Sequence, residues 1–183
     1  MKRDTKEELL KSAKSEILKY GYRKASVRRI CENAGVTTGA LYFLFKDKED
    51  IFASLVDDPL TRFEEIIRNH FEKIDVSYLI EELISLFFRY EDEFRLLFLK
   101  AEGSPFEDIR DRIVDLLETH NRNLAKRITG EEPDQFAIHW ISHEQLSAFM
   151  NLTEHCGSEE EALEKGKDLE RYLKAGWEAL IIE

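Results

Sequence analysis

The chain has 183 residues, of which 43% are hydrophobic and 36% charged, a composition typical of a globular protein and not of a disordered one. No apolar run approaches the roughly 20 residues that span a bilayer, and the charged start lacks the apolar segment of a signal peptide. We therefore expect a cytoplasmic protein with no membrane partner, although the net charge of −11 argues at first against DNA binding.

The charge is unevenly distributed along the chain. Residues 1–50 contain 12 Lys and Arg against 8 Asp and Glu, a balance of +4, whereas the remaining residues carry −15. Phosphate binding requires local positive charge and not a positive total, so the first fifty residues can still contact DNA. A balance of this size is common, however, and does not identify a DNA-binding protein by itself.

Apolar periodicity predicts helices along the whole chain, and no segment has the alternation of a strand. Leu9, Ala13, Ile17 and Tyr20 form a helical stripe that ends at Gly21. An all-α fold is therefore expected.

Two short helices follow the first one. Ser26 is a suitable N-cap for the second helix, and Gly35 ends it. The third helix begins at Thr37 or Thr38 and ends near Phe45. Helix, glycine turn and short helix in this order are typical of a helix-turn-helix.

A fourth helix is predicted to begin after Asp47 and to kink or restart at Pro59, because proline is costly inside a helix. Beyond it we expect five more helices, at about residues 60–74, 76–100, 106–128, 134–155 and 158–183. We divide the chain into residues 1–50, a three-helix DNA-binding domain, and residues 51–183, a second helical domain.

The turn of the helix-turn-helix is made by Gly35, which adopts left-handed backbone easily, and Val36, which packs between the helices. If the apolar residues of this segment pack inward, the following residues face solvent: Thr37, Thr38, Gly39, Tyr42 and Phe43. Gly39 is a poor choice for strengthening an exposed helix, and it makes sense where the backbone must approach another surface closely. The alternative is a helical hairpin of the core in which Tyr42 and Phe43 are buried.

Residues 17–52 resemble the DNA-binding domain of the TetR family of transcriptional regulators. The resemblance rests on these motifs: Tyr20-Gly21-Tyr22, Ser26-Val27-Arg28, Ala34-Gly35-Val36, Gly39-Ala40-Leu41-Tyr42, Phe45-Lys46, Lys48-Glu49 and Ile51-Phe52. It departs from the family at Cys31, where alanine is common, and at Leu44, where a polar or aromatic residue is commoner.

The resemblance implies contacts to operator DNA, most of them to phosphate. The implied DNA-binding residues are Ser26, Arg28, Thr37, Thr38, Gly39, Tyr42, Phe43, Lys46 and Lys48. It also implies a homodimer formed through the last two helices and a small-molecule effector bound by the second domain. The function it implies is a ligand-responsive repressor on a palindromic operator, and the alternative is a helical protein-interaction module without DNA binding.

Aromatic residues of the second domain are candidates for the effector pocket. The candidates are the aromatic residues Tyr78, Phe87, Tyr90, Phe94, Phe98 and Trp140, together with the cation Arg95. Arg95 suggests an anionic or polar ligand. The alternative is that these side chains belong to the ordinary core.

The sequence gives no reason to expect catalysis or a metal. No phosphate loop, nucleophile elbow or zinc-protease motif is present, so we expect neither an enzyme nor a cofactor. His139 and His143 have the i, i+4 spacing of a chelating pair, but no further ligand is evidently placed to complete a metal site. Cys31 and Cys156 are expected to be buried thiols.

Overall fold

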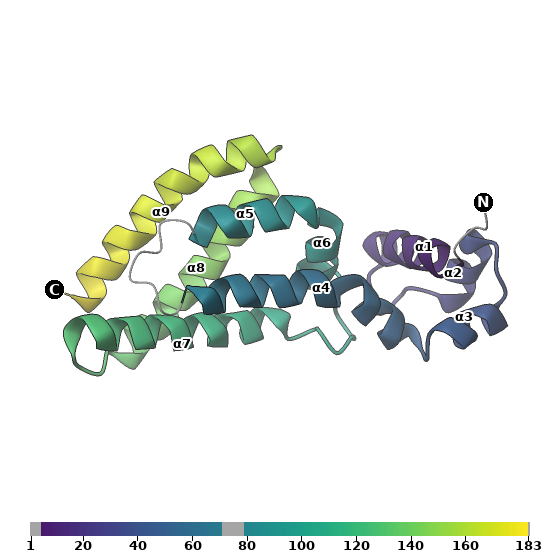
Figure 1. The fold of residues 1–183 in the computed structure, drawn as a ribbon, viewed down its shortest axis with the longest axis horizontal. Helices are drawn as coiled ribbons and strands as arrows, with labels where there is room; N and C mark the ends of the chain where they lie inside the picture. Colours follow the sequence, from purple (N-terminus) through teal and green to yellow (C-terminus); the bar gives the residue numbers. More distant parts are fainter. Residues whose placement is uncertain (1–4, 71–78, 183) are drawn as a thin grey trace. The chain divides into compact units, whose positions relative to one another are not determined.

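The computed structural model describes residues 5–70 and 79–182, and over these ranges the chain is helical without strands, which confirms the all-α prediction. The helices are α1 (Thr5–Tyr20), α2 (Val27–Ala34), α3 (Thr38–Leu44), α4 (Lys48–Asn69), α5 (Leu79–Arg89), α6 (Glu91–Leu99), α7 (Ile109–Thr129), α8 (Gln135–His155) and α9 (Glu159–Ile181) (Figure 1). None of the helices in the described ranges is long and apolar enough to cross a membrane.

The chain forms two compact units. Unit 1 contains Met1–Thr61 and Tyr90–Ile109, and unit 2 contains Arg62–Arg89 and Arg110–Glu183. Unit 1 thus combines the helix-turn-helix with α6, which packs against α1. The division at residues 50 and 51 stays a prediction, because compactness does not show which segment folds alone.

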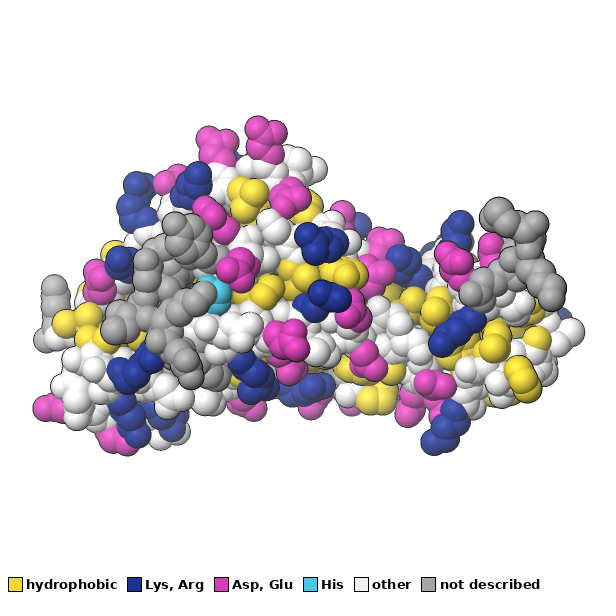
Figure 2. Space-filling view, viewed as in Figure 1, with side chains coloured by type: hydrophobic (Ala, Val, Ile, Leu, Met, Phe, Trp, Pro, Cys, Tyr) yellow, Lys and Arg dark blue, Asp and Glu magenta, His cyan; other side chains and the backbone are white. Residues whose placement is uncertain are grey.

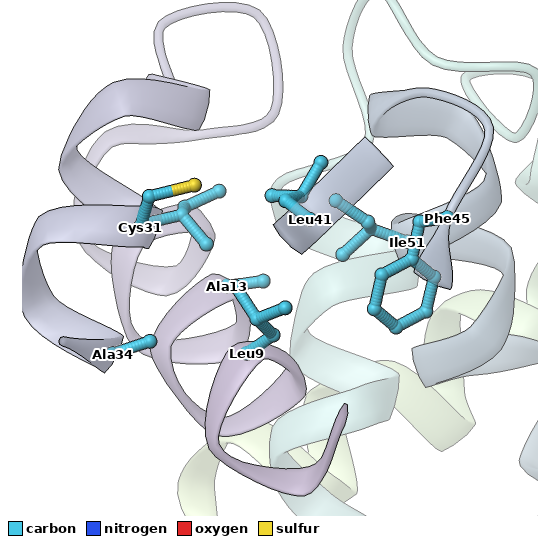
Figure 3. Close-up of a cluster of buried hydrophobic side chains, with 8 residues drawn as sticks. Leu9, Ala13, Cys31, Ala34, Leu41, Phe45 and Ile51 are labelled. Carbon is cyan, nitrogen blue, oxygen red and sulfur yellow. The ribbon is translucent and has the colours of Figure 1, made fainter. Parts of the chain in front are cut away.

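The core of unit 1 joins α1, α2 and α3 to the start of α4 (Figure 3). Its buried members are Leu9, Ala13, Ile30, Cys31, Ala34, Leu41, Phe45 and Ile51, with Val36 and Leu44 packed against them. The predicted inward face of the helix-turn-helix is therefore confirmed. Tyr20 differs from the prediction, because its side chain is 41% exposed and the buried stripe of α1 ends at Ile17.

The ends of these short helices are fixed by the predicted residues. The side chains of Ser26 and Thr37 accept hydrogen bonds from the N–H groups of Arg29 and Ala40, and Gly35 ends α2 with φ of 69°. Each cap satisfies a backbone donor that the helix leaves unpaired. Local chemistry thus fixes where the helix-turn-helix begins, turns and ends.

Of the kink or restart predicted at Pro59, the restart is wrong, because α4 continues through this residue to Asn69, and the kink stays a prediction. A proline inside a helix costs about 3 kcal/mol. Val56 and Phe63, one turn before and one turn after Pro59, are both buried, and the burial of such side chains offsets that cost.

The predicted single helix over residues 76–100 is also wrong in its described part, because α5 and α6 are separated at Tyr90. Tyr90 has φ of −125° and ψ of 39°, outside the helical region, and its hydroxyl donates to Asp58 Oδ2 at 3.2 Å. The apolar residues of α5 and α6 belong to two different cores, because Phe87 is buried in unit 2 and Phe94 is buried in unit 1.

Candidate nucleic-acid interface

The outer face of α3 carries two adjacent aromatic side chains that lie in solvent. Tyr42 is 57% exposed and Phe43 is 89% exposed, whereas Leu41 is completely buried. Thr37, Thr38 and Gly39 are exposed on the first turn of the same helix. The alternative of a core hairpin with Tyr42 and Phe43 buried is therefore wrong.

Gly39 is not required by the packing of the chain. A Cβ added there would meet Thr37 Oγ1 at 3.8 Å, an ordinary contact, and nothing closer. Because glycine lowers the stability of a helix by roughly 0.5–1 kcal/mol relative to alanine, the fold itself would favour alanine. Its presence is explained if the backbone of α3 approaches an external surface.

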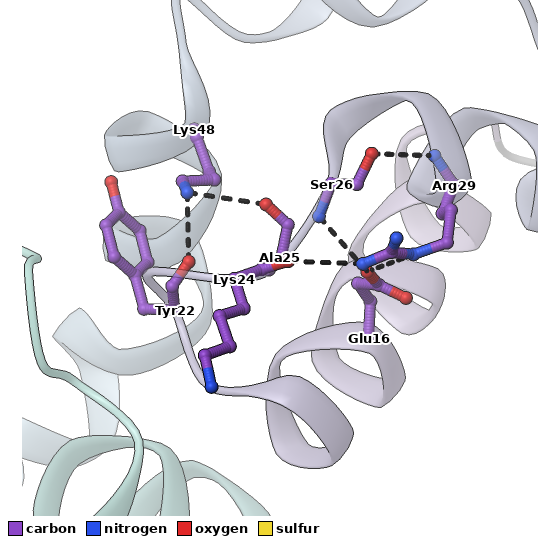
Figure 4. A network of polar contacts seen from close by, with 7 residues as sticks. All are labelled: Glu16, Tyr22, Lys24, Ala25, Ser26, Arg29 and Lys48. Carbon is purple, nitrogen blue, oxygen red and sulfur yellow. Dashed lines mark hydrogen bonds and ion pairs between the residues drawn. The ribbon is translucent and has the colours of Figure 1, made fainter.

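A buried carboxylate positions α2 on α1 (Figure 4). Glu16 Oε1 accepts from Arg29 Nη2 at 2.6 Å, from Arg29 Nε at 2.7 Å and from the N–H of Ser26 at 3.1 Å. The Arg29 guanidinium also lies 4.8 Å from the centre of the Tyr20 ring, within the range of a cation–π contact. These contacts hold the beginning of α2, and α2 packs against α3.

The pKa of Glu16 reflects this network. Burial alone would raise the pKa of the carboxyl group, but the hydrogen bonds from Arg29 and Ser26 and the charge of Arg29 bring it below its ordinary value of 4.5. The role of Glu16 could not be recognised from the sequence, because a glutamate on a helix is normally solvated.

Lys48 is bound within unit 1. Its Nζ donates to the carbonyl oxygens of Tyr22 at 2.9 Å and Ala25 at 3.4 Å, and lies 4.3 Å from the centre of the Tyr22 ring. Burial lowers the pKa of Lys48. This side chain ties the loop before α2 to the start of α4, and its predicted contact to phosphate stays a prediction.

The other predicted cations are more accessible. The Arg28 side chain is exposed, and its Nε pairs with Glu32 Oε1 at 2.7 Å. Lys46 is exposed, and its backbone N–H donates to Asp50 Oδ2 at 2.9 Å, which fixes the residue at the start of α4. Figure 2 shows that Lys and Arg side chains alternate with acidic ones on the visible face. On this face, any attraction to phosphate would therefore come from particular side chains and not from a uniformly basic surface.

The two departures from the TetR pattern are accommodated by the core. Cys31 is buried, and burial raises the pKa of its thiol, which keeps it protonated. Leu44 packs against the same core. Neither departure changes the side chains that α3 exposes at Tyr42 and Phe43.

Unit 2 contains a cavity of about 490 Å³ between α4, α5, α7, α8 and α9. None of the described residues predicted to line a pocket borders it. Phe87 is buried beside Phe149, with ring centres 6.2 Å apart, and Trp140 is exposed. Tyr78 lies outside the described residues.

The remaining candidates belong to unit 1. Phe94 stacks on Phe98 with ring centres 5.9 Å apart, Tyr90 bonds Asp58, and the exposed Arg95 pairs with Glu91 at 3.4 Å. The part of these residues in ligand binding stays a prediction. Sequence reasoning missed the cavity because its walls come from five helices far apart in the chain.

His139 and His143 lie close together, with ring centres 4.4 Å apart, and His139 Nδ1 is 2.7 Å from Glu118 Oε1. The described part of the chain contains no group of three or more side chains arranged to hold a metal ion.

Comparison with known proteins agrees with this geometry. The model of "Bacterial regulatory proteins, tetR family" matches residues 9–55. The HTH-type transcriptional repressor AcnR of Corynebacterium diphtheriae is 34% identical over 62 residues, which cover 34% of this chain and 33% of the relative. The chain thus spans about a third of the length of this curated relative.

Solved structures resemble the chain over nearly its whole length. A transcriptional regulator from Aquifex aeolicus VF5 has a TM-score of 0.65 at 21% identity, covering 92% of this chain and 99% of its own. FadR from Bacillus subtilis, solved with stearoyl-CoA, has a TM-score of 0.56 at 18% identity, covering 96% of this chain and 97% of its own. Likeness at this identity concerns the fold alone. Residues 9–55 therefore carry a DNA-binding domain of the TetR type, on a chain whose all-helical fold resembles that of solved transcriptional regulators.

Proposed function

We propose that this chain is a ligand-responsive transcriptional repressor that binds a palindromic operator as a homodimer. The observation that carries the proposal is the outer face of α3, where exposed Tyr42 and Phe43 accompany a glycine that the fold does not require. A helix of this kind enters the major groove in helix-turn-helix proteins. The repressor among the relatives favours DNA binding over an interaction module, and a regulatory role over an enzyme.

The grip on DNA would come mainly from phosphate contacts. The proposed contacts are Ser26, Arg28, Thr37, Thr38, Tyr42, Lys46 and Lys48, with Gly39 allowing close approach and Phe43 reaching base edges. Phosphate contacts set register and affinity, whereas base contacts set sequence preference. Phe43 offers an apolar surface suited to a thymine methyl group.

Replacing Gly39 with alanine tests the role of this residue, because the change should raise the stability of the chain and lower its affinity for DNA. The Gly39→Ala chain should gain about 0.5–1 kcal/mol in free energy of unfolding, because nothing within the chain opposes the added methyl group. Its affinity for a duplex selected by the wild-type chain from a random pool should fall at least about tenfold, the effect of a clash of roughly 1.4 kcal/mol. Denaturant unfolding and fluorescence anisotropy measure the two quantities. Equal affinity of the two chains, or failure of the wild type to select any duplex, would contradict the proposal.

The dimer is proposed to form through α8 and α9, which carry exposed apolar side chains. Phe136 and Trp140 lie one turn apart on α8, and Tyr172 and Leu180 lie two turns apart on α9. Large exposed apolar side chains on two helices that pack against each other support association through these helices. A two-fold dimer would place its two recognition helices about 34–36 Å apart or at a multiple of that spacing.

Leu180→Arg tests the dimer, with Leu99→Arg as a matched control. The two leucines are similarly exposed, at 46% and 48%, but Leu99 lies on α6 in unit 1. In a symmetric interface both subunits carry the introduced charge, so Leu180→Arg would bury two arginines. This variant should raise the dimer dissociation constant at least about tenfold, whereas Leu99→Arg should leave it unchanged. Sedimentation velocity measures both, and the same dissociation constant for the two variants would exclude this interface.

A ligand in the cavity of unit 2 is proposed to control the operator affinity. α4 is one continuous helix whose beginning belongs to unit 1 and whose end lines the cavity with Phe63 and Ile67. A ligand that favours one position of α4 would change the distance between the two helix-turn-helix segments of the dimer. By the same coupling, DNA binding would alter the affinity for the ligand.

A further inference from the structure

The wall of the cavity in unit 2 is mostly aliphatic and aromatic. Phe63, Leu83, Leu117 and Phe149 are among the side chains that line it, and all four are buried. Its volume of about 490 Å³ lies within the range of about 300–1,000 Å³ that is usual for small-molecule sites. A ligand of this cavity must therefore be largely apolar.

The charged side chains among the described lining residues come from one helix and nearly cancel. Glu170, Lys174 and Glu178 succeed one another at one-turn intervals on α9, with a net charge of −1, and Lys174 and Glu178 are exposed. Burial lowers the pKa of His120 to about 4, so its imidazole adds no charge near neutral pH. A buried carboxylate without a dedicated cation is costly, so this lining disfavours an anionic ligand.

Four uncharged polar side chains also line the cavity: Trp177, His120, Asn121 and Gln145. Trp177 is 9% exposed, and its Nε1–H has no hydrogen-bond partner among the described residues. Asn121 Nδ2 donates to Ser142 Oγ at 2.9 Å and to Gln145 Oε1 at 2.8 Å, which uses one of the two acceptor positions of the Gln145 oxygen. A buried donor left without an acceptor costs about 1–3 kcal/mol, which a ligand with an acceptor would recover.

We propose that this cavity binds an uncharged, largely apolar molecule carrying a hydrogen-bond acceptor, such as a carbonyl or ester oxygen, that accepts from Trp177 Nε1–H. The amide N–H of Gln145 that does not face Asn121 provides a second donor. This inference rests on the proposed function, because it names the chemical class of the effector. It replaces the anionic ligand suggested by Arg95, which does not line the cavity.

Three probes with a ten-carbon chain and different polar groups separate the ligand classes: methyl decanoate, decanoate and decylammonium. Calorimetric titration of the DNA-free chain should show saturable binding of the ester, with the two ions at least about tenfold weaker because each must be desolvated. Absence of ester binding, or equal binding of either ion, would overturn the inference.

Trp177→Phe tests the anchoring N–H, and Trp140→Phe is its matched control. Both changes replace an indole by a phenyl ring, but Trp140 is 49% exposed and does not border the cavity. Loss of one hydrogen bond should weaken ester binding about three- to tenfold in Trp177→Phe and leave it unchanged in Trp140→Phe. Equal affinity of the two variants would overturn the role of Trp177. Gln145→Met replaces the amide of a half-buried side chain by a thioether of similar size. It should weaken ester binding as well, and it tests the polar anchor if Trp177→Phe does not fold.

Anisotropy of the selected duplex with and without ester distinguishes this inference from the proposed function. Ester binding that leaves duplex affinity unchanged would support the ligand class and contradict control by this cavity. Release of duplex by decanoate or decylammonium, without ester binding, would support ligand control and contradict the class proposed here.

Discussion

Replacing Glu16 with alanine is expected to lower the free energy of unfolding of the chain by about 2 kcal/mol, the scale of a hydrogen bond to a charged group. Glu16 is buried and accepts from Arg29 and from the N–H of Ser26, so its removal leaves the start of α2 without its anchor. Arg29 is partly exposed and can return to water, which limits the loss. Affinity for the selected duplex should fall too, because α2 supports α3.

The exposed Glu7 on the same helix provides the control, and Glu7→Ala should change stability by less than about 0.5 kcal/mol. The effect of Glu16 also depends on pH. Its folded pKa is lower than its ordinary value of 4.5, so its stabilising contribution is present above pH 4.5 and is lost as the pH falls through the folded pKa. Urea unfolding at neutral and acidic pH should therefore show a difference between wild type and Glu16→Gln that shrinks in acid. A difference that grows in acid would contradict the ion pair.

The double change Tyr42→Ala and Lys46→Ala is expected to weaken duplex binding at least about 100-fold. Both side chains are exposed, so neither stabilises the core, and each is lost twice from a dimer. Hydrogen bonds to charged groups contribute about 1.5–3 kcal/mol, and two of them already exceed the 2.8 kcal/mol or so that corresponds to this factor. Stability should change by less than about 0.5 kcal/mol.

The exposed Lys11 on α1 serves as the control for charge, and Lys11→Ala should bind the duplex as the wild type does. Duplex titration and thermal unfolding of the same preparations separate lost contacts from lost structure. If the double variant binds as tightly as wild type while both remain folded, α3 is not the element that grips DNA.

The helix-turn-helix could be predicted from the sequence because its signals are local. Ser26, Gly35 and Thr37 act on backbone groups a few residues away, and the outward positions of Tyr42 and Phe43 follow from helical periodicity. The same reasoning failed where distant contacts decide. α4 passes through Pro59, and the long apolar run is divided at Tyr90 between two cores.

The polar groups of the sites show the same limit. Glu16 and Lys48 look like ordinary surface charges, yet one is buried against Arg29 and the other binds two carbonyl oxygens. Trp177 could be recognised as a cavity residue only once α9 was placed beside α8, because its neighbours in sequence are exposed. Sequence periodicity gives the face of a helix, but the partner of that face depends on the whole fold.

Titration of the selected duplex with the wild-type chain over a series of salt concentrations measures DNA binding by α3 most directly. Binding should saturate at two chains per duplex, and the logarithm of the association constant should fall linearly with the logarithm of the salt concentration. In Lys46→Ala the slope should be smaller by about 2, because two phosphate contacts per dimer are lost. An unchanged slope with unchanged affinity, or no saturable binding by the wild type, would contradict the proposed operator binding.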